Sequence, residues 1–423
     1  MTIKLNDVKN IAEKLENPLF VVGGLIRNYL ISGEINTDID LCGAYKTEEL
    51  LPVLIDCGFF VVAEYKRTGT IVFTKNGVKY EYTTFRTESY NVGGNHTPFE
   101  VCFTDDVIAD AKRRDFTCNA VYYDIKKKQI TDPLNKGVAD IKNRVLDTVI
   151  SPDKVFASDG LRLMRLARFC GELSFSPKKS VIVSAEKNRY NVSDISGERI
   201  YSELKSILYA DKKYSFSGAN GHIVALNVLN DIGVINVLFG IDKADFDSVI
   251  KIVRSDVSDR LSAFLYGVIS LSDDTKKALK NINTRLKPDK KTVGKIKRFL
   301  SFDEFLSQKN SKGRIRYFLA VNRDLIKDYL SVKKAQGTTG KNAGARQNAD
   351  KLLSVLLKME KEGAPFSFSD LNIGAQEIIN CGVIGKDIQV IREKLLFYAV
   401  NHPKKNKKDN LQKLLMKLTR KSY

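Results

Sequence analysis

The chain has 423 residues, which is enough for two to four domains with substantial hydrophobic cores. Its 69 Lys and Arg residues outnumber the 50 Asp and Glu residues, and the net charge of +19 favours a polyanionic partner, most often a nucleic acid. A globular protein with merely basic faces is the alternative from charge alone. No segment approaches the roughly 18 consecutive apolar residues of a membrane span, so no membrane-spanning helix is expected.

The cysteines and histidines bear on the cellular compartment and on the kind of metal site that the chain can form. The six cysteines are scattered without a C-x-x-C pair, and the N-terminus lacks an apolar secretory segment, so we expect reduced thiols and a cytoplasmic protein. Only three histidines occur, which argues against a metal site built from histidine.

The first third of the chain alternates between strand and helix patterns. Helical periodicity is expected at 1–20, 24–32 and 47–57. Strand patterns occur at 19–22, 38–42, 60–64, 70–74, 78–84 and 119–124. Asn76-Gly77 is a typical hairpin turn between two of these strands. The pattern predicts a mixed α/β domain with much antiparallel pairing.

Strand patterns nearly vanish after residue 137. Helical segments are predicted at 153–172, 178–189, 198–209, 222–230, 245–253 and 258–271, with further helices beyond. Residues 337–348 contain three glycines and are predicted to be a flexible connection. Two basic runs, 276–298 and 404–421, favour contact with RNA or DNA, although a solvated charged face is the alternative for each.

Two acidic residues follow a glycine pair by about one helix. Asp38 and Asp40 lie two residues apart on a predicted strand, so both side chains point to one side of the sheet. Such a carboxylate pair suits Mg²⁺, which completes its shell with substrate phosphates. Gly23-Gly24 opens a helix whose first N–H groups can hold a phosphate, although a tight strand-to-helix turn is the alternative. Together these features indicate phosphoryl or nucleotidyl transfer.

Two further residues are candidates beside this pair. Arg27 falls in the first helical turn after Gly24 and can clamp triphosphate oxygens. Glu81 follows in another predicted strand and is a candidate third carboxylate, with an edge-strand glutamate as the alternative.

A second cluster lies at residues 112–120. Arg114 suits a phosphate, and Asp115 or Asn119 can bond ribose hydroxyls and thereby select ribonucleotides. A solvated basic turn before a strand is the alternative.

A third cluster is predicted on one helix, where Asp159, Arg162, Arg165 and Arg168 recur every three residues. Leu163, Met164 and Ala167 occupy the opposite half of this helix and are predicted core residues. A surface row of salt bridges is the alternative for the polar half. An Asp beside an Arg matches the amine donor and ring-nitrogen acceptor that cytosine and adenine share, whereas guanine and uracil present the reverse. The pair can therefore select C and A without a nucleic-acid template, because a mispaired buried polar group costs about 1–3 kcal/mol.

In this order the motifs resemble those of the class II, bacterial-type tRNA nucleotidyltransferases, the CCA-adding enzymes related to bacterial poly(A) polymerases. The matching motifs cover roughly residues 19–205: Gly-Gly-x-x-Arg at 23–27, Asp-x-Asp at 38–40, Arg-Arg-Asp-Phe-Thr-x-Asn-Ala at 113–120, Asp-Pro…Gly…Asp-Ile at 132–141, and Asp-x-x-Arg-x-x-Arg-x-x-Arg-Phe at 159–169.

The resemblance implies an α+β fold, with a DNA polymerase β-like nucleotidyltransferase head followed by an elongated all-α part. The implied domains are a catalytic head at 1–139, a neck at 140–210, a body at 211–335 and a tRNA-binding tail at 336–423. Asp38 and Asp40 match metal ligands, and Asp159 and Arg162 match the residues that read the base. The remaining matches are nucleotide contacts: Gly24, Arg27, Arg114, Arg165 and Arg168.

The chain departs from the usual family pattern at three places. Asn28 stands where Asp is usual, and Ser158 stands where Glu is usual, which is expected to weaken the orientation of Arg162. The segment 93–98 lacks the usual adjacent arginines, which bears on the switch from C to A addition. No departure removes an expected metal ligand or base-reading residue.

The resemblance implies a monomeric, Mg²⁺-dependent enzyme that adds C, C and A to the 3′ end of tRNA from CTP and ATP. A CC-adding or A-adding specialist and a poly(A) polymerase are the alternatives within the enzyme class. The loop at 86–105 has about full length, which favours complete CCA addition over CC addition. A non-catalytic RNA-binding homologue is the alternative from another class, but the intact Asp-x-Asp argues against it.

Overall fold

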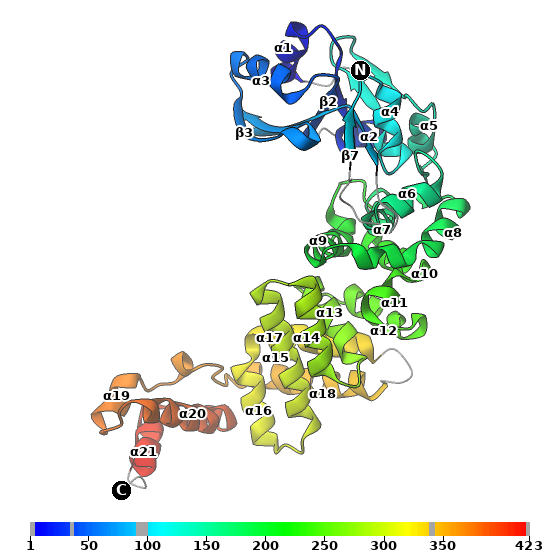
Figure 1. Cartoon of the computed structure of the whole chain (residues 1–423). Coiled ribbons are helices and arrows are strands. Elements are labelled where there is room, and N and C mark those ends of the chain that lie inside the picture. Colours follow the sequence, from blue (N-terminus) through cyan, green and yellow to red (C-terminus); the bar gives the residue numbers. More distant parts are fainter. Residues whose placement is uncertain (1–4, 34–37, 90–99, 338–342, 420–423) are drawn as a thin grey trace. The chain divides into compact units, whose positions relative to one another are not determined.

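A computed structural model describes residues 5–33, 38–89, 100–337 and 343–419. The chain divides into two compact units, the first comprising residues 1–243 and 280–288 and the second 244–279 and 289–423. The first unit contains a mixed sheet and helices, whereas the described part of the second unit is helical (Figure 1). The predicted combination of an α/β head with a helical remainder is therefore confirmed. The finer division into four domains stays a prediction.

A seven-stranded sheet forms the centre of the head, in the order β3-β4-β5-β2-β1-β8-β9. Neighbouring strands are antiparallel except for the parallel pair β2 and β5. The strands are β1 (Leu19–Val22), β2 (Asp38–Gly43), β3 (Phe60–Tyr65), β4 (Thr70–Lys75), β5 (Val78–Thr84), β8 (Tyr122–Asp124) and β9 (Gln129–Thr131). Two small sheets accompany it: β6 (Arg86–Ser89) with β7 (Glu100–Phe103), and β10 (Val145–Leu146) with β11 (Ser176–Pro177).

The two faces of the sheet differ because side chains alternate along each strand. Val21, Leu41, Tyr82 and Ile71 are paired across four strands, and all four are buried. The next paired row turns to the opposite face and contains Asp40, which is exposed, beside Glu81, which is half-buried. Burial of the first row holds the register that aligns these two carboxylates.

The helices of the first unit are α1 (Asn6–Lys14), α2 (Gly24–Ser32), α3 (Thr47–Asp56), α4 (Val107–Lys112), α5 (Gly137–Lys142), α6 (Pro152–Ser158), α7 (Leu161–Leu173), α8 (Lys179–Lys187), α9 (Gly197–Leu208), α10 (Gly221–Asp231) and α11 (Val234–Phe239). The helix expected at 1–20 is shorter in the structure, where it ends at Lys14 and a strand begins at Leu19, whereas the spans expected at 24–32 and 47–57 match α2 and α3 closely. Residues 117–119 form a short 3₁₀ turn rather than the start of the predicted strand 119–124, which begins at Tyr122.

The single helix predicted at 153–172 is wrong at one point, because the chain breaks between α6 and α7. Asp159 is extended there, with φ −151° and ψ 107°, and Gly160 precedes the first residue of α7. A Cβ on Gly160 would lie 2.1 Å from the backbone oxygen of Asn191, so only glycine permits this close approach.

The remaining helices belong wholly or largely to the second unit, except α14 (Thr275–Leu286), whose residues 280–286 belong to the first unit. They are α12 (Lys243–Arg254), α13 (Arg260–Ser270), α14 (Thr275–Leu286), α15 (Lys290–Ser307), α16 (Lys312–Val321), α17 (Arg323–Gln336), α18 (Ala343–Lys361), α19 (Ala375–Asn380), α20 (Lys386–Asn401) and α21 (Lys408–Thr419). The flexible connection predicted at 337–348 is wrong from Ala343 onward, where α18 begins, and residues 338–342 lie outside the described part.

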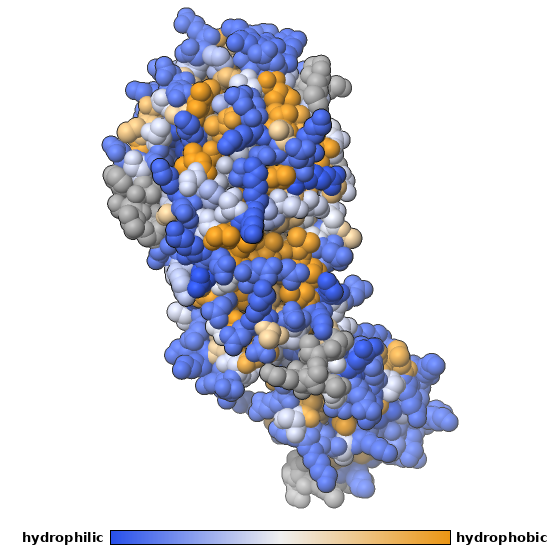
Figure 2. Space-filling model, turned by 90° about the vertical axis from the view of Figure 1, so that its right-hand side faces the viewer, coloured by the Kyte–Doolittle hydropathy of each residue, from blue (hydrophilic) through white to orange (hydrophobic). Residues whose placement is uncertain are grey.

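Most of the molecular face in Figure 2 is hydrophilic, with apolar patches between the polar side chains. No described helix combines the length and the apolarity that crossing a bilayer requires.

Candidate functional site

A cavity of about 630 Å³ lies in the first unit and is lined by nine of the residues that the sequence predicts for the site. They are Gly24, Arg27, Asp40, Arg114, Asp115, Asn119, Asp159, Arg162 and Arg165. These residues come from the sheet, from α2, from the 112–119 segment and from the start of α7, so the fold gathers four motifs that are far apart in the sequence.

Asp40 lies on one wall of the cavity, next to the glycine turn that begins α2. Gly23 adopts φ +77°, and a Cβ there would lie 3.4 Å from the Asp40 carboxylate. The backbone of the turn therefore approaches the carboxylate in a conformation that favours glycine.

Within the described part of the chain, the structure does not place the other two predicted carboxylates, Glu81 and Asp38, at the cavity. Glu81 is the register neighbour of Asp40 on β5, but it does not line the cavity. The side chain of Asp38 lies outside the described part of the chain, although its backbone pairs with Lys79 on β5. Among the described side chains, no three His, Cys, Asp or Glu residues group closely enough to hold a metal ion. The metal pair and the third carboxylate stay predictions.

Arg27 is buried against the cavity wall and is held on several sides. Its Nη1 donates to Asn119 Oδ1 at 2.6 Å, and its Nη2 donates to the Tyr214 hydroxyl at 3.2 Å. Its Nε and Nη2 also donate to Asn28 Oδ1 at 3.1 and 3.0 Å. Asn28, one of the departures from the family pattern, thus orients the guanidinium without neutralising its charge. The fixed positive charge suits a phosphate group.

Asp115 is the central acceptor of the site and is 6% exposed. Its Oδ2 accepts from Arg165 Nε at 2.7 Å, and its Oδ1 accepts from Asn119 Nδ2 at 3.0 Å. Burial alone would raise the pKa of Asp115, but the charge of Arg165 and the hydrogen bond from Asn119 outweigh burial and hold this pKa well below its usual range. Asp115 therefore stays charged and fixes two cavity residues.

Arg114 is fixed by a buried acid behind the cavity. Its Nη2 donates to Asp110 Oδ2 at 3.0 Å and its Nε to the Tyr122 hydroxyl at 2.9 Å. Asp110 is fully buried, and Tyr122 also donates to it at 2.7 Å. Burial would raise the pKa of Asp110, but the charges of Arg114 and Arg113 lower it overall. The Arg114 guanidinium is therefore held in place with its charge intact.

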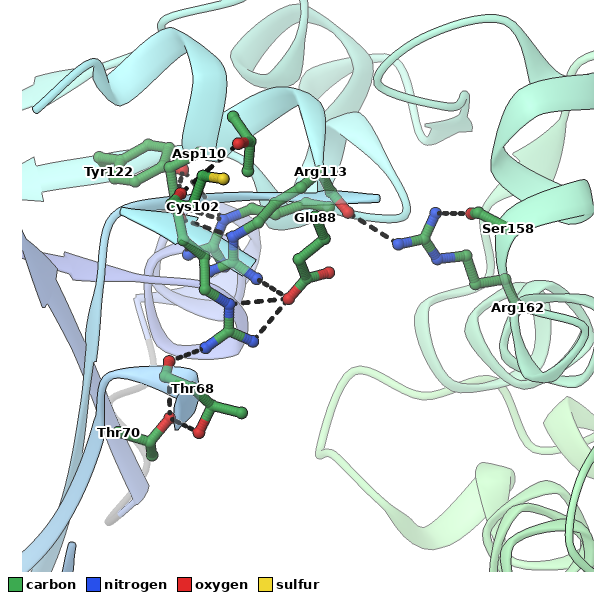
Figure 3. A network of polar contacts seen from close by, with 12 residues as sticks. Thr68, Thr70, Glu88, Cys102, Asp110, Arg113, Tyr122, Ser158 and Arg162 are labelled. Carbon is green, nitrogen blue, oxygen red and sulfur yellow. Dashed lines mark hydrogen bonds and ion pairs between the residues drawn. The ribbon is translucent and has the colours of Figure 1, made fainter. Parts of the chain in front are cut away.

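Asp159 and Arg162 line the cavity from the break between α6 and α7. Asp159 is not on the face of α7, contrary to the prediction of one polar row, and its Oδ1 instead accepts from the Leu161 N–H at 2.9 Å. Arg162 Nη2 donates to the Arg113 carbonyl at 2.7 Å, and its Nη1 donates to Ser158 Oγ at 3.0 Å (Figure 3). Ser158 Oγ in turn donates to the Val155 carbonyl at 2.9 Å. Ser158 thus helps to orient Arg162, where a weakened orientation was expected.

The opposite side of α7 is core, as predicted. Leu163, Met164 and Ala167 are fully buried. Arg168 does not line the cavity: its Nε pairs with Glu203 of α9 at 3.0 Å, and its guanidinium lies 4.7 Å from the Phe169 ring centre. Its predicted nucleotide contact stays a prediction, and its described contacts join α7 to α9.

Several cavity residues were not singled out from the sequence. They are Arg67, Thr68, Arg86, Glu88, Arg113, Leu161, Phe169, Arg199 and Tyr214. Glu88 Oε1 accepts from Arg86 Nε at 2.7 Å and lies 3.7 Å from Arg113 Nη1, so the hairpin β6–β7 is joined to the 112–119 segment (Figure 3). Arg113 could have been predicted from the sequence, since it adjoins Arg114 in a basic run. Tyr214 and Arg86 could not, because only the fold brings them to the cavity.

Charge decides what this cavity can hold. Eight arginines line it against four carboxylates, namely Asp40, Glu88, Asp115 and Asp159. The excess of fixed guanidinium charge favours a polyphosphate, and the exposed Asp40 beside it favours a divalent cation that such a ligand carries.

Comparisons with known proteins agree with this geometry. Residues 19–147 match the poly A polymerase head domain family. A CCA-adding enzyme from Geobacillus sp. (strain WCH70) is 36% identical over 218 residues, which cover 50% of this chain and 51% of that protein. A CCA-adding enzyme from Lactobacillus delbrueckii subsp. bulgaricus is 32% identical over 274 residues, which cover 60% of this chain and 65% of that protein. The matched part therefore spans about one half to two thirds of these curated relatives.

Solved structures match over nearly the whole chain. The Bacillus stearothermophilus CCA-adding enzyme in complex with CTP has a TM-score of 0.69 at 20% identity, with 100% of this chain and 99% of that chain covered. The Thermotoga maritima CCA-adding enzyme complexed with tRNA has a TM-score of 0.66 at 18% identity, with 97% and 94% covered. At this level of identity the likeness shows the fold of the whole chain.

Proposed function

We propose that this chain, whose head is a poly A polymerase head domain and whose fold is that of the CCA-adding enzymes, adds CCA to the 3′ end of tRNA from CTP and ATP. One observation carries the proposal: a single cavity contains Asp40, the fixed arginines Arg27 and Arg114, and the Asp159–Arg162 pair. These are the three parts that template-independent nucleotide addition needs, namely a carboxylate for the metal, donors for the triphosphate and a reader for the base.

The reaction is an in-line attack of the RNA 3′-hydroxyl on the α-phosphate, with diphosphate as the leaving group. Arg27 and Arg114 bind the triphosphate, and the buried partners that hold them keep the phosphates aligned for attack. Asp38 and Asp40 are the residues that would hold Mg²⁺, and Glu81 on the adjacent strand would support them. When bound, the metal would activate the hydroxyl and stabilise the leaving oxygens.

The base is selected by Asp159 and Arg162, which line the cavity from the break between α6 and α7. The carboxylate of Asp159 accepts from the exocyclic amine of cytosine or adenine, and Arg162 donates to the adjacent ring nitrogen. Arg113 and Ser158 fix Arg162, so the pair is pre-organised for this pattern. Asp115 and Asn119 orient Arg165 and Arg27, and either side chain is a candidate to bond the ribose hydroxyls.

The test is an incorporation assay with tRNA that lacks its 3′ CCA, Mg²⁺, and each nucleoside triphosphate alone and in combination. We expect incorporation of C and A and no comparable incorporation of U or G. Asp40→Asn should lower kcat by at least about 10³-fold and leave tRNA binding intact, because it removes only metal-held chemistry. Asp56→Asn, which changes another exposed head carboxylate, is the matched control.

The same assay separates the alternatives. Addition limited to CC, addition of A only to tRNA ending in CC, or long A tails on any RNA would identify a specialist or a poly(A) polymerase. Incorporation of all four nucleotides would contradict the role of Asp159 and Arg162. We also propose a monomer in the cytoplasm, and the location is supported by six free cysteines.

A further inference from the structure

The second unit contains a separate pocket with an aromatic lining. A cavity of about 410 Å³ lies between α16, α20 and the segment 366–368 that precedes Asp370. Three rings line it, from Tyr317, Phe366 and Phe368, and all three are half-buried. Half-buried rings at a cavity leave part of each π-face accessible to a planar ligand.

The aromatic segment is held rigidly. Asp370 Oδ2 accepts from the N–H groups of Phe366 and Ser367, both at 2.9 Å. Asn406 Nδ2 donates to the Asp370 carbonyl at 2.8 Å and so fixes the other end of the segment. A pocket whose rings are already positioned binds a planar ligand with little loss of conformational entropy.

The chemistry around the rings is cationic and polar. The Arg392 guanidinium lies 3.9 Å from the Phe368 ring centre, and the Arg323 guanidinium lies 4.3 Å from the Phe366 ring centre. Arg392 Nε is a buried donor that hydrogen-bonds to no described residue. At the same pocket, Gln389 Nε2 donates to Glu393 Oε1 at 2.9 Å, so an amide and a carboxylate are available for the polar edge of a ligand.

The charge of the surrounding chain identifies the kind of ligand. Residues 386–417 contain nine Lys and Arg residues against three acids, which favours a polyanion. Aromatic faces with arginine beside them and a polar edge are the features that bind unstacked bases of single-stranded nucleic acid. We propose that this aromatic pocket accepts one unpaired nucleobase of the RNA substrate, with the neighbouring phosphates bound by the basic side chains around it. The inference rests on the proposed function, which supplies the RNA.

The test uses the full chain and tRNA that lacks its 3′ CCA. Phe366→Leu and Phe368→Leu remove a π-face and keep most of the apolar volume. We expect each to weaken tRNA binding by about 5- to 100-fold in fluorescence anisotropy and to raise KM for tRNA equally, with kcat at saturating tRNA unchanged. Tyr65→Leu, which changes a 57% exposed ring of the head, should bind tRNA like the wild type.

A second measurement does not depend on the variants. Ultraviolet irradiation of the wild-type complex with tRNA, followed by mass spectrometry, should give nucleotide adducts on peptides that contain Tyr317 or residues 366–368. Unchanged affinity in folded leucine variants, or adducts only elsewhere, would overturn the pocket and leave the proposed function standing. A wild-type protein that binds tRNA but adds no nucleotide would contradict the proposed function instead.

Discussion

Asp115 shows how one buried carboxylate organises a site at the scale of a residue. It accepts from Arg165, from Asn119 and from the Phe116 N–H, and Asn119 accepts in turn from Arg27. The result is a continuous polar chain from one arginine of the cavity to another. These hydrogen bonds stabilise the site more as a network than the sum of the single bonds, because each buried donor needs its acceptor.

Asp115→Asn should lower the free energy of unfolding by about 3 kcal/mol at pH 7, because Arg165 loses its buried counter-charge. The pKa of Asp115 is lowered in the folded state, so its stabilisation is complete above its ordinary value near 4 and is lost as the pH falls further. Denaturant unfolding of wild type and variant at pH 7, 5 and 3.5 checks this. A stability gap that widened toward acid pH would contradict the assignment.

Ser158→Ala should reduce kcat/KM for CTP and ATP by about 5-fold, because Arg162 loses one hydrogen bond worth about 1 kcal/mol. Discrimination against UTP and GTP should fall with it, while tRNA affinity stays constant. Ser206→Ala removes an exposed hydroxyl that bonds its own helix and serves as the control. Single-nucleotide incorporation kinetics provide the measurement, and unchanged discrimination would speak against a positioning role.

Much of the site could be predicted at this scale, because charged residues in short motifs are visible in the sequence. Arg27, Asp40, Arg114 and Arg162 do line one cavity. The partners that hold them were not predicted. Asp110 looks like an ordinary helical acid in the sequence, and only the structure shows its hydrogen bonds with Arg114 and Tyr122. Long-range pairing has no local signature.

At the scale of elements, the break between α6 and α7 sets the position of Asp159 and Arg162, the proposed base-reading residues. Gly160 packs against the backbone of Asn191, and Asp159 is turned out of the helix just before it. The close approach fixes where α7 begins. The positions of the Asp159 and Arg162 side chains therefore depend on Gly160, which itself has no side chain.

Gly160→Ala should destabilise the first unit by about 1–3 kcal/mol, because its Cβ would overlap the carbonyl oxygen of Asn191 in the 3₁₀ helix Arg189–Asp194. Gly294→Ala is the matched control, because Gly294 is exposed within α15 and has open space around it. The control should gain about 0.5–1 kcal/mol from helix propensity. Thermal unfolding measures both, and equal changes of the same sign would refute the packing argument.

Most head strands could be predicted because hydrophobic alternation and the Asn-Gly turn report a half-buried sheet. The expected spans 70–74 and 78–84 match β4 and β5 almost residue for residue. The break at 159–160 could not be predicted, because apolar periodicity continues on both sides of it and only tertiary contact shows why the chain turns. The strands β6 and β7 were missed because each has only four residues, and β6 (Arg-Thr-Glu-Ser) is polar throughout.

At the scale of the whole molecule, the net charge of +19 makes the proposed association with RNA depend on salt. We expect tRNA affinity to fall at least tenfold between 50 and 200 mM salt, because each neutralised phosphate releases counterions. Fluorescence anisotropy over this range measures the slope. The affinity for CTP, which a few cavity arginines are proposed to bind, should fall less. An equal salt dependence of CTP and tRNA binding would contradict this prediction.

The cavity is assembled from residues as far apart as Gly23 and Tyr214. In the sheet beside it, strand β1 pairs with β8, which lies about one hundred positions later in the sequence. A growing polypeptide therefore has no complete cavity until Tyr214 has emerged from the ribosome. If the proposed function holds, we expect prematurely terminated chains to be inert toward nucleotides rather than to add them with poor selectivity.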